Sequence, residues 1–175
     1  MPAIFDLQNV SFHYDNVPAL NNLTMQIESG QQVALLGANG SGKSTLLRLL
    51  DGLCFPAAGT IHFEDQLLTE TVLQEDEFAF AFRRRVAFVF QNPDVQLFNP
   101  TVFDEVAFGP LQMGWTAKEV TERVNQSLEF MRITQLKDRP PYRLSGGEKK
   151  RVALASVLVL DPDVHGNLTI VLDDV

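Results

Sequence analysis

The order of apolar and polar residues predicts β-strands in the first part of the chain. The pattern of residues 4–14 predicts one or two extended segments, that is, β-strands. Leu23, Met25 and Ile27 alternate with polar residues, which indicates a half-buried strand. Residues 33–36 form a short, continuous apolar run, which is typical of a strand buried in a parallel sheet.

Apolar residues at helical spacing predict three main helices, at residues 45–53, 116–131 and 145–160. The second is the clearest, since four apolar residues share one face: Val120, Val124, Leu128 and Met131. Thr116 and Glu119 predict a capping box at its start. Shorter patterns predict strands at 60–64, 86–90 and 170–172, a helix within 70–85, and loops at 91–100 and 137–144.

Strands that alternate with helices predict an α/β fold with a mainly parallel core sheet. The N-terminal strands are expected to be antiparallel, and residues 95–160 to form a mostly helical subdomain. We therefore predict a single domain over residues 1–175, in which residues 1–94 and 161–175 make the α/β core.

Composition and charge narrow the possible functions. The net charge is −8, and a nucleic-acid-binding protein would more often be basic, so no nucleic-acid partner is expected. An acidic protein can still bind a polyphosphate, because the local field of the site decides. No signal peptide is visible, and the longest apolar stretches are about half the roughly 20 residues that a membrane span needs. A role at the membrane therefore requires a partner protein.

A glycine-rich loop carries the strongest chemical signal. Residues 37–44, GANGSGKS, fit the pattern G-x-x-x-x-G-K-[ST] between a predicted strand and a predicted helix, as in P-loop NTPases. Glycines let the backbone amides turn inward around phosphate, and the helix N-terminus adds positive charge. Lys43 is expected to reach the β- and γ-phosphates and Ser44 to hold Mg²⁺. The predicted nucleotide contacts are Gly37, Asn39, Gly40, Ser41, Gly42, Lys43, Ser44 and Thr45.

The helix predicted at 145–160 begins with a second candidate anion site. Ser145 and Glu148 form a capping box, and Gly146 and Gly147 expose backbone amides between them. An ordinary capped helix explains the same residues, so both interpretations stay open on spacing alone.

Several motifs in order resemble those of ABC ATPases. Residues 144–155, LSGGEKKRVALA, are similar to the signature motif, and residues 89–93, VFQNP, to the Q-loop. Residues 11–14, SFHY, with PAL at 18–20, resemble the aromatic loop that stacks on adenine. The absence of an Asn-Lys-x-Asp element also favours ATP over GTP.

Residues 90–98, FQNPDVQLF, and 101–110, TVFDEVAFGP, resemble one branch of that family. This branch is the energy-coupling-factor ATPases, which include cobalt and nickel importers, and the similarity covers residues 3 to about 164. The resemblance implies a peripheral ATPase subunit on the cytoplasmic face of the membrane that energises import of a metal ion or a vitamin. Two other interpretations are a soluble ABC ATPase that acts on DNA or ribosomes, and a nucleotide-binding fragment without hydrolysis.

The resemblance also implies roles for single residues. Tyr14 would stack on adenine, and Gln91 would contact Mg²⁺ or the attacking water and report γ-phosphate to a transmembrane subunit. Ser145, Gly146 and Gly147 would contact the ATP bound by a second ATPase subunit, identical or related, in a head-to-tail dimer. Residues 91–108 would form much of the docking surface, where three aromatic residues fit either docking or a core role: Phe98, Phe103 and Phe108.

The C-terminus departs from the family, which has an apolar strand ending in Asp-Glu-Pro directly after residue 164. In one interpretation residues 170–173 are a displaced Walker B strand, Asp173 serves Mg²⁺, and Asp174 replaces the catalytic Glu. In the other, which we favour, residues 166–172 resemble the later strand before the switch histidine, and the segment between is missing. His165 precedes the strand and does not fit that switch. We expect ATP binding to persist and hydrolysis to be weak or absent.

Overall fold

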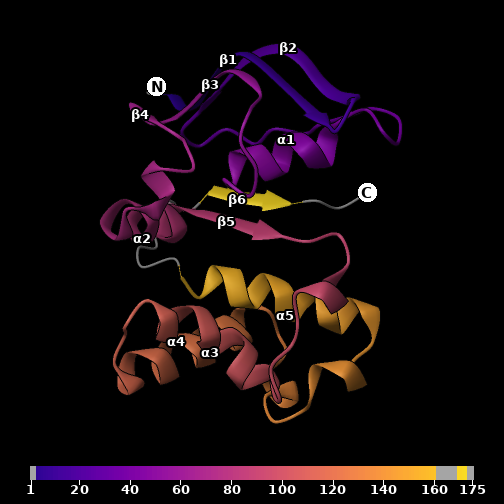
Figure 1. The fold of residues 1–175 in the computed structure, drawn as a ribbon. Helices are drawn as coiled ribbons and strands as arrows, with labels where there is room; N and C mark the ends of the chain where they lie inside the picture. The colour runs from indigo at the N-terminus through magenta and orange to yellow at the C-terminus, as the bar shows by residue number, and fades with distance from the viewer. Residues whose placement is uncertain (1–2, 161–168, 173–175) are drawn as a thin grey trace. The chain divides into compact units, whose positions relative to one another are not determined.

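The structure, a computed structural model, describes residues 3–160 and 169–172. The chain divides into two compact units, residues 1–83 and 84–175 (Figure 1). The predicted boundaries of the helical subdomain, at residues 95 and 160, stay a prediction.

An antiparallel sheet forms the frame of the first unit (Figure 1). Its order is β2-β1-β3-β4, made by Val17–Glu28 (β2), Ala3–Tyr14 (β1), Ala58–Phe63 (β3) and Gln66–Leu67 (β4). Helix α1, Lys43–Leu50, lies against β2 and buries Leu46, Leu49 and Leu50. The predicted antiparallel N-terminal strands are thus confirmed, and β1 extends over the whole predicted range.

Aromatic packing fills the core of this unit. The 3-10 turn Val72–Gln74 (η1) and helix α2, Asp76–Arg85, occupy the range in which a helix was predicted. Phe82 is fully buried, with its ring edge-on to Phe63 at a centroid distance of 5.0 Å. Phe63 in turn meets Phe5 of β1 at 5.3 Å, so the helix is joined to the sheet through adjacent rings.

The strand predicted at residues 33–36 is wrong for this structure. These residues have no regular structure, and Val33 and Leu36 are 49% and 93% exposed. An apolar run becomes a strand only when its backbone groups find a ladder partner. No described strand pairs with this segment, and the apolar pattern alone cannot supply one.

The second unit combines a short parallel sheet with helices. Val86–Val89 (β5) and Thr169–Leu172 (β6) pair in parallel, with Val89 opposite Leu172. The helices are Val102–Gln112 (α3), Ala117–Phe130 (α4) and Gly146–Leu158 (α5). Short 3-10 turns lie at Pro93–Val95 (η2), Thr134–Leu136 (η3) and Pro141–Arg143 (η4). None of the helices in the described ranges is long and apolar enough to cross a bilayer.

Helix α5 joins the strands to the helical core. Its residues Ala153 and Val157 pack against Ala87 and Val89 of β5. Other positions of α5 enter the helical core, which is made by Val102, Val106, Ala107, Val120, Val124, Leu128, Ile133, Leu136, Leu144, Val152, Ala155 and Val159. The apolar face predicted for α4 is confirmed, with Val120, Val124 and Leu128 buried.

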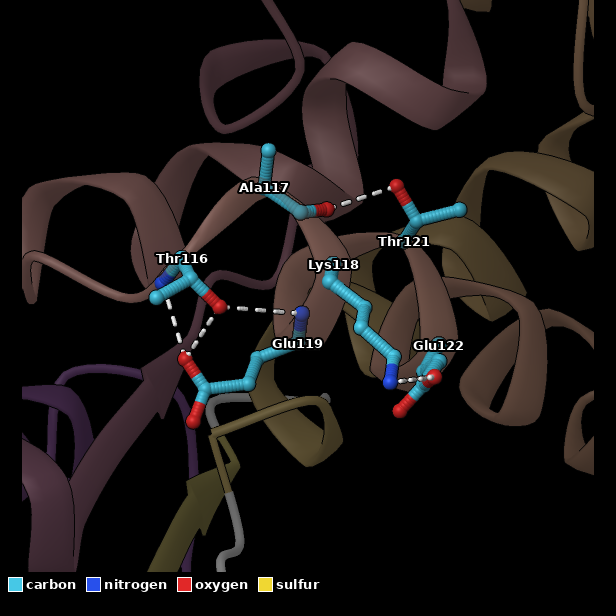
Figure 2. A network of polar contacts seen from close by, with 6 residues as sticks. All are labelled: Thr116, Ala117, Lys118, Glu119, Thr121 and Glu122. Atoms are coloured by element: carbon cyan, nitrogen blue, oxygen red, sulfur yellow. Dashed lines mark hydrogen bonds and ion pairs between the residues drawn. The ribbon is translucent and has the colours of Figure 1, made fainter.

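The start of α4 confirms the predicted capping box (Figure 2). The backbone N–H of Thr116 donates to Glu119 Oε2 at 2.9 Å, and the Glu119 N–H donates to Thr116 Oγ1 at 3.3 Å. The Thr116 hydroxyl also donates to the same carboxylate, and these hydrogen bonds lower the pKa of Glu119. Each partner thus satisfies a backbone N–H that the helix itself leaves unpaired.

A buried carboxyl ends the helix that follows the glycine-rich loop. Asp51, at the C-terminus of α1, is 4% exposed, and Arg83 Nη1 lies 3.3 Å from Oδ2 and 2.7 Å from the main-chain oxygen. Burial raises the pKa of Asp51 to about 6, and the nearby Arg83 only partly opposes that rise. Desolvation prevails because the Arg83 side chain is itself 38% exposed and its charge is screened by water.

We predict that the Asp51→Asn variant changes how stability depends on pH. Because the pKa rises from 3.8 unfolded to about 6 folded, the stability that this carboxyl contributes is present below pH 3.8 and is lost as the pH rises through about 6. Relative to wild type, the unfolding free energy of Asp51→Asn should therefore rise between those values, by roughly 2–3 kcal/mol at most. Urea unfolding of both proteins across this range measures it, and a constant difference contradicts the prediction.

Candidate functional site

The glycine-rich loop lies exposed directly before α1. Residues 37–41 are exposed, and the Ser41 N–H donates to the Ala38 carbonyl at 3.1 Å, which makes a turn. Gly40 and Gly42 have φ of +82° and +91°, in the left-handed region that favours glycine. Gly42, a fixed position of the motif, and Gly40 inside the loop therefore hold backbone angles that residues with a side chain rarely adopt.

The first N–H groups of α1 have no capping side chain. Gly42 is its N-cap, no side-chain hydrogen bond caps it within the described residues, and the first turn carries no acidic residue. Helices α3, α4 and α5 differ, because Thr101, Thr116 and Ser145 cap them and each has an acidic first turn. The N-terminus of α1 thus keeps its partial positive charge for an anion from outside the helix.

Lys43 lies over the loop that it was predicted to serve. Its Nζ donates to the carbonyls of Gly37 at 2.8 Å and Ala38 at 3.1 Å. The ammonium group is therefore held beside the loop, where a bound phosphate would meet it. Ser44, the predicted Mg²⁺ ligand, is the next residue of the same helical turn, and its metal contact stays a prediction.

Tyr14 is close to α1. It ends β1, is 45% exposed, and its hydroxyl accepts a hydrogen bond from the Thr45 Oγ1 at 3.4 Å. The ring of Phe12 meets it edge-on at 5.0 Å. The structure therefore brings the predicted adenine-stacking residue and the phosphate loop into one neighbourhood, and Phe12 is an adjoining ring to which sequence reasoning gave no role of its own.

Gln91 belongs to the second unit and follows β5 in an exposed segment. Just after it, the side chain of Asn92 accepts a hydrogen bond from the Asp94 N–H at 3.0 Å and starts the turn η2. Strand β6 runs parallel to β5, and its last residue, Leu172, lies opposite Val89. Both strands therefore end at the same side of the sheet, where the segment that contains Gln91 begins. His165, Asp173 and Asp174 lie outside the described residues.

The segment that resembles the signature motif begins α5, with Ser145 as its N-cap and exposed backbone at Gly146 and Gly147. The Ser145 hydroxyl donates to Glu148 Oε2 at 2.7 Å and the Ser145 N–H donates to the same oxygen at 2.8 Å, which confirms the predicted capping box. The hydrogen bond from the Ser145 hydroxyl lowers the pKa of Glu148 the most, and the hydrogen bond from the Ser145 N–H lowers it further. A Cβ added at Gly146 would meet no described atom within 4 Å, and at Gly147 only the Arg151 side chain at 3.9 Å. The space above the two glycines is therefore free for a ligand.

Comparison with known proteins decides the family. The sequence pattern of the family described as "ABC transporter" matches residues 20–167. The chain belongs to the ABC transporter ATPase family. The resemblance inferred from the signature and Q-loop motifs is confirmed.

The ABC ATPase has relatives among metal importers. It is 60% identical over 164 residues to the nickel import ATP-binding protein NikO of Rhodobacter capsulatus, with 94% of this chain and 65% of that protein covered. It is 49% identical to the nickel import ATP-binding protein LarO of Lactiplantibacillus plantarum, with 90% and 66% covered. The chain thus spans about two thirds of the length of these relatives.

Solved structures support the same fold. The structure of cbiO1 from Clostridium perfringens, part of the ABC transporter complex cbiONQ, superposes with a TM-score of 0.77 at 36% identity, with 93% of this chain and 63% of that chain covered. A dimeric ATP-binding cassette bound to ADP and Pi also gives 0.77, at 27% identity, with 90% and 70% covered. The predicted P-loop NTPase fold, with antiparallel N-terminal strands, is confirmed.

The aromatic residues of the ABC ATPase between 91 and 108 divide into two groups. Phe103 packs against the helical core and lies under the ammonium of Lys137, 4.7 Å from its ring centre. Phe98 and Phe108 are 67% and 41% exposed and meet edge to face at 5.1 Å. Only this exposed pair remains a candidate for docking.

A buried carboxylate that sequence reasoning missed holds Phe98 in place. Glu105 of α3 is 4% exposed, and its Oε2 accepts hydrogen bonds from the backbone N–H groups of Phe98 at 2.8 Å and Asn99 at 2.7 Å. The Asn99 side-chain amide donates to the same oxygen at 3.3 Å. The place of Glu105 between the apolar residues Val102 and Val106 is a sequence signal that its side chain is buried. The spacing does not show which groups it binds.

We predict unequal costs for two substitutions in the phosphate loop. Gly42→Ala puts a Cβ into the Ala19 carbonyl oxygen and within 2.9 Å of Leu20, in addition to its positive φ. Gly40→Ala has the same strain but nothing within 4 Å among the described atoms. Gly42→Ala should lower the free energy of unfolding by about 2–4 kcal/mol and Gly40→Ala by about 1 kcal/mol. Urea unfolding of both variants measures this, and equal losses refute the close packing at Gly42.

Proposed function

We propose that this chain binds ATP with Mg²⁺ and, as the ATPase subunit of an importer, couples ATP binding and hydrolysis to transport of a metal ion across a membrane. The observation that carries the ATP-binding part is the start of α1, where uncapped N–H groups, two glycines with positive φ and Lys43 converge on one exposed loop. Family membership extends this from an anion site to a nucleotide site.

Each residue of the site then has a physical task. The loop amides and the N-terminus of α1 hold the phosphates, while Lys43 exchanges its two carbonyl partners for the β- and γ-phosphates. Ser44 and Gln91 offer oxygen ligands to Mg²⁺, which neutralises phosphate charge when bound. Tyr14 offers an exposed ring, held beside α1 by Thr45, on which adenine stacks.

A second ATPase subunit completes the nucleotide site. In the proposed head-to-tail dimer, Ser145, Gly146 and Gly147 of one subunit contact the γ-phosphate held by the other. The open space above the two glycines supports this role, since a phosphate can approach the backbone there. A relative of known structure is a dimer bound to ADP and Pi, which also supports it.

The transported substrate is a metal ion rather than a vitamin in this proposal. Two relatives of this chain, at 60% and 49% identity, are named nickel import proteins. The transmembrane partner docks on the exposed rings of Phe98 and Phe108, which contact each other. The chain then lies peripherally on the cytoplasmic face of the membrane. A soluble ABC ATPase acting on nucleic acid is disfavoured by the net charge of −8.

Hydrolysis depends on residues after β6. Leu172 pairs with Val89, so the chain reaches residue 172 at the sheet edge from which the Gln91 segment leaves. This arrangement supports the interpretation of residues 170–173 as a displaced Walker B strand over the deletion favoured from the sequence; in that interpretation Asp173 serves Mg²⁺ and Asp174 replaces the catalytic Glu. The alternative is a nucleotide-binding chain that does not hydrolyse ATP.

We predict that Lys43→Ala weakens ATP binding by about 10- to 100-fold, because it removes a charge-assisted contact to phosphate. Titration with a fluorescent ATP analogue in the presence of Mg²⁺ measures the affinity. Thr116→Ala serves as a control, since it removes a cap from α4 in the other unit. ATP affinity that is equal in wild type and Lys43→Ala would sink the proposed nucleotide site.

Single-turnover hydrolysis at high protein concentration separates the two C-terminal interpretations. Cleavage of ATP that is lost in Lys43→Ala and in Asp174→Asn supports the displaced Walker B strand. Binding without cleavage supports a nucleotide-binding chain that lacks its own general base.

We predict that Phe98→Ser weakens the complex with the transmembrane subunit by about 10-fold or more, as expected for an exposed aromatic anchor. ATP affinity should stay unchanged. Phe130→Ser, on α4, is the matched control, because Phe130 is 76% exposed and outside the proposed docking surface. Affinity for the membrane complex in detergent measures the effect, and equal losses in both variants contradict the assignment.

A further inference from the structure

One side chain joins the segment that contains Gln91 to the signature helix α5. The side-chain oxygen of Gln96, Oε1, accepts a hydrogen bond from the Phe90 backbone N–H at 3.3 Å. Its amide nitrogen donates to the Ala153 carbonyl and to the Ser156 hydroxyl, each at 3.2 Å. Gln96 thus binds the residue just before Gln91 and two positions on α5 at once.

An ion pair repeats this connection nearer the start of α5. Lys149 Nζ lies 2.6 Å from Asp94 Oδ1, and the lysine side chain is 17% exposed. Lys149, Ala153 and Ser156 follow one another at spacings of four and three residues, so they share one face of the helix. That face is therefore bound to the segment 90–96 along about two helical turns.

We propose that Gln96 is a positioning residue that makes the Gln91 segment and helix α5 move together, so that a change at Gln91 reaches Ser145 at the start of α5. This inference rests on the proposed function, in which Gln91 senses the γ-phosphate and Ser145 contacts a second nucleotide. Asp94 and Lys149 assist at the end of the helix that is nearer to Ser145.

The chemistry of the side chain explains why glutamine is required. A primary amide supplies one acceptor for the Phe90 N–H and two donors for the Ala153 and Ser156 oxygens. Glutamate keeps the shape but offers no donor, so its charge would face the Ala153 carbonyl. Methionine keeps a similar volume but offers no N–H donor.

Hydrogen exchange with and without ATP and Mg²⁺ tests the proposal in the whole chain, at a dilution where the protein is a monomer. In wild type, ATP should change exchange in both segments 90–97 and 145–150. In Gln96→Met and Gln96→Glu, the response of 90–97 should persist while that of 145–150 falls about fivefold or more. ATP affinity should stay within about twofold of wild type.

Two controls separate positioning from a general loss of stability. Ser127→Ala removes the hydrogen bond from Ser127 Oγ to the Ala155 carbonyl, at 2.9 Å, which also joins α5 to a neighbour but not to the Gln91 segment. This variant should keep both responses. Asp94→Lys and Lys149→Asp should each weaken the response of 145–150, and the double variant should restore it.

The outcomes are distinct. A wild type that binds no ATP overturns the proposed function. A wild type that binds ATP and responds at 90–97 but not at 145–150 overturns the coupling alone. A response of 145–150 that is as large in the Gln96 variants as in Ser127→Ala overturns the role of Gln96.

Discussion

The rule that every backbone N–H needs an acceptor organises this protein. The first turn of an α-helix leaves its N–H groups unpaired, and in α3, α4 and α5 the side chains of Thr101, Thr116 and Ser145 each accept a hydrogen bond from one of them. Helix α1 follows Gly42 and lacks such a side chain among the described residues. Its first backbone amides can therefore bind an external anion, and the adjacent Lys43 supplies a positive charge that favours phosphate.

Local features of the fold could be predicted from the sequence because they depend on neighbours in the chain. The two capping boxes, the apolar face of α4 and the glycines of the loop are set within a few residues. The strand at 33–36 failed because a strand needs a partner from elsewhere. Glu105 and Gln96 were missed for the same reason, since their partners are fixed only when α3 and α5 pack. That packing also leaves Phe98 exposed and places Phe103 against the helical core.

Two buried carboxyls show how partners decide the cost of burial. Three N–H donors converge on one oxygen of Glu105, so burial there fixes a loop. Asp51 has one cation, Arg83, that is partly exposed, and its pKa rises to about 6. The first carboxylate orders a surface with two exposed aromatic rings. The stability that Asp51 contributes to the fold falls as the pH rises. Asp51 lies at the C-terminal end of α1, the helix that follows the phosphate loop.

Helix α5 is constrained on two adjacent faces and at its N-terminus. Val152, Ala155 and Val159 are buried in the helical core, whereas Lys149, Ala153 and Ser156 face the segment that contains Gln91. A helix packed in this way cannot slide past one neighbour without disturbing the other, because close-packed interiors deform little. A displacement of the Gln91 segment must therefore either break the contacts of Gln96 and Lys149 or carry α5 with it. The second course moves Ser145 and the two open glycines, which are the groups proposed to contact a second nucleotide.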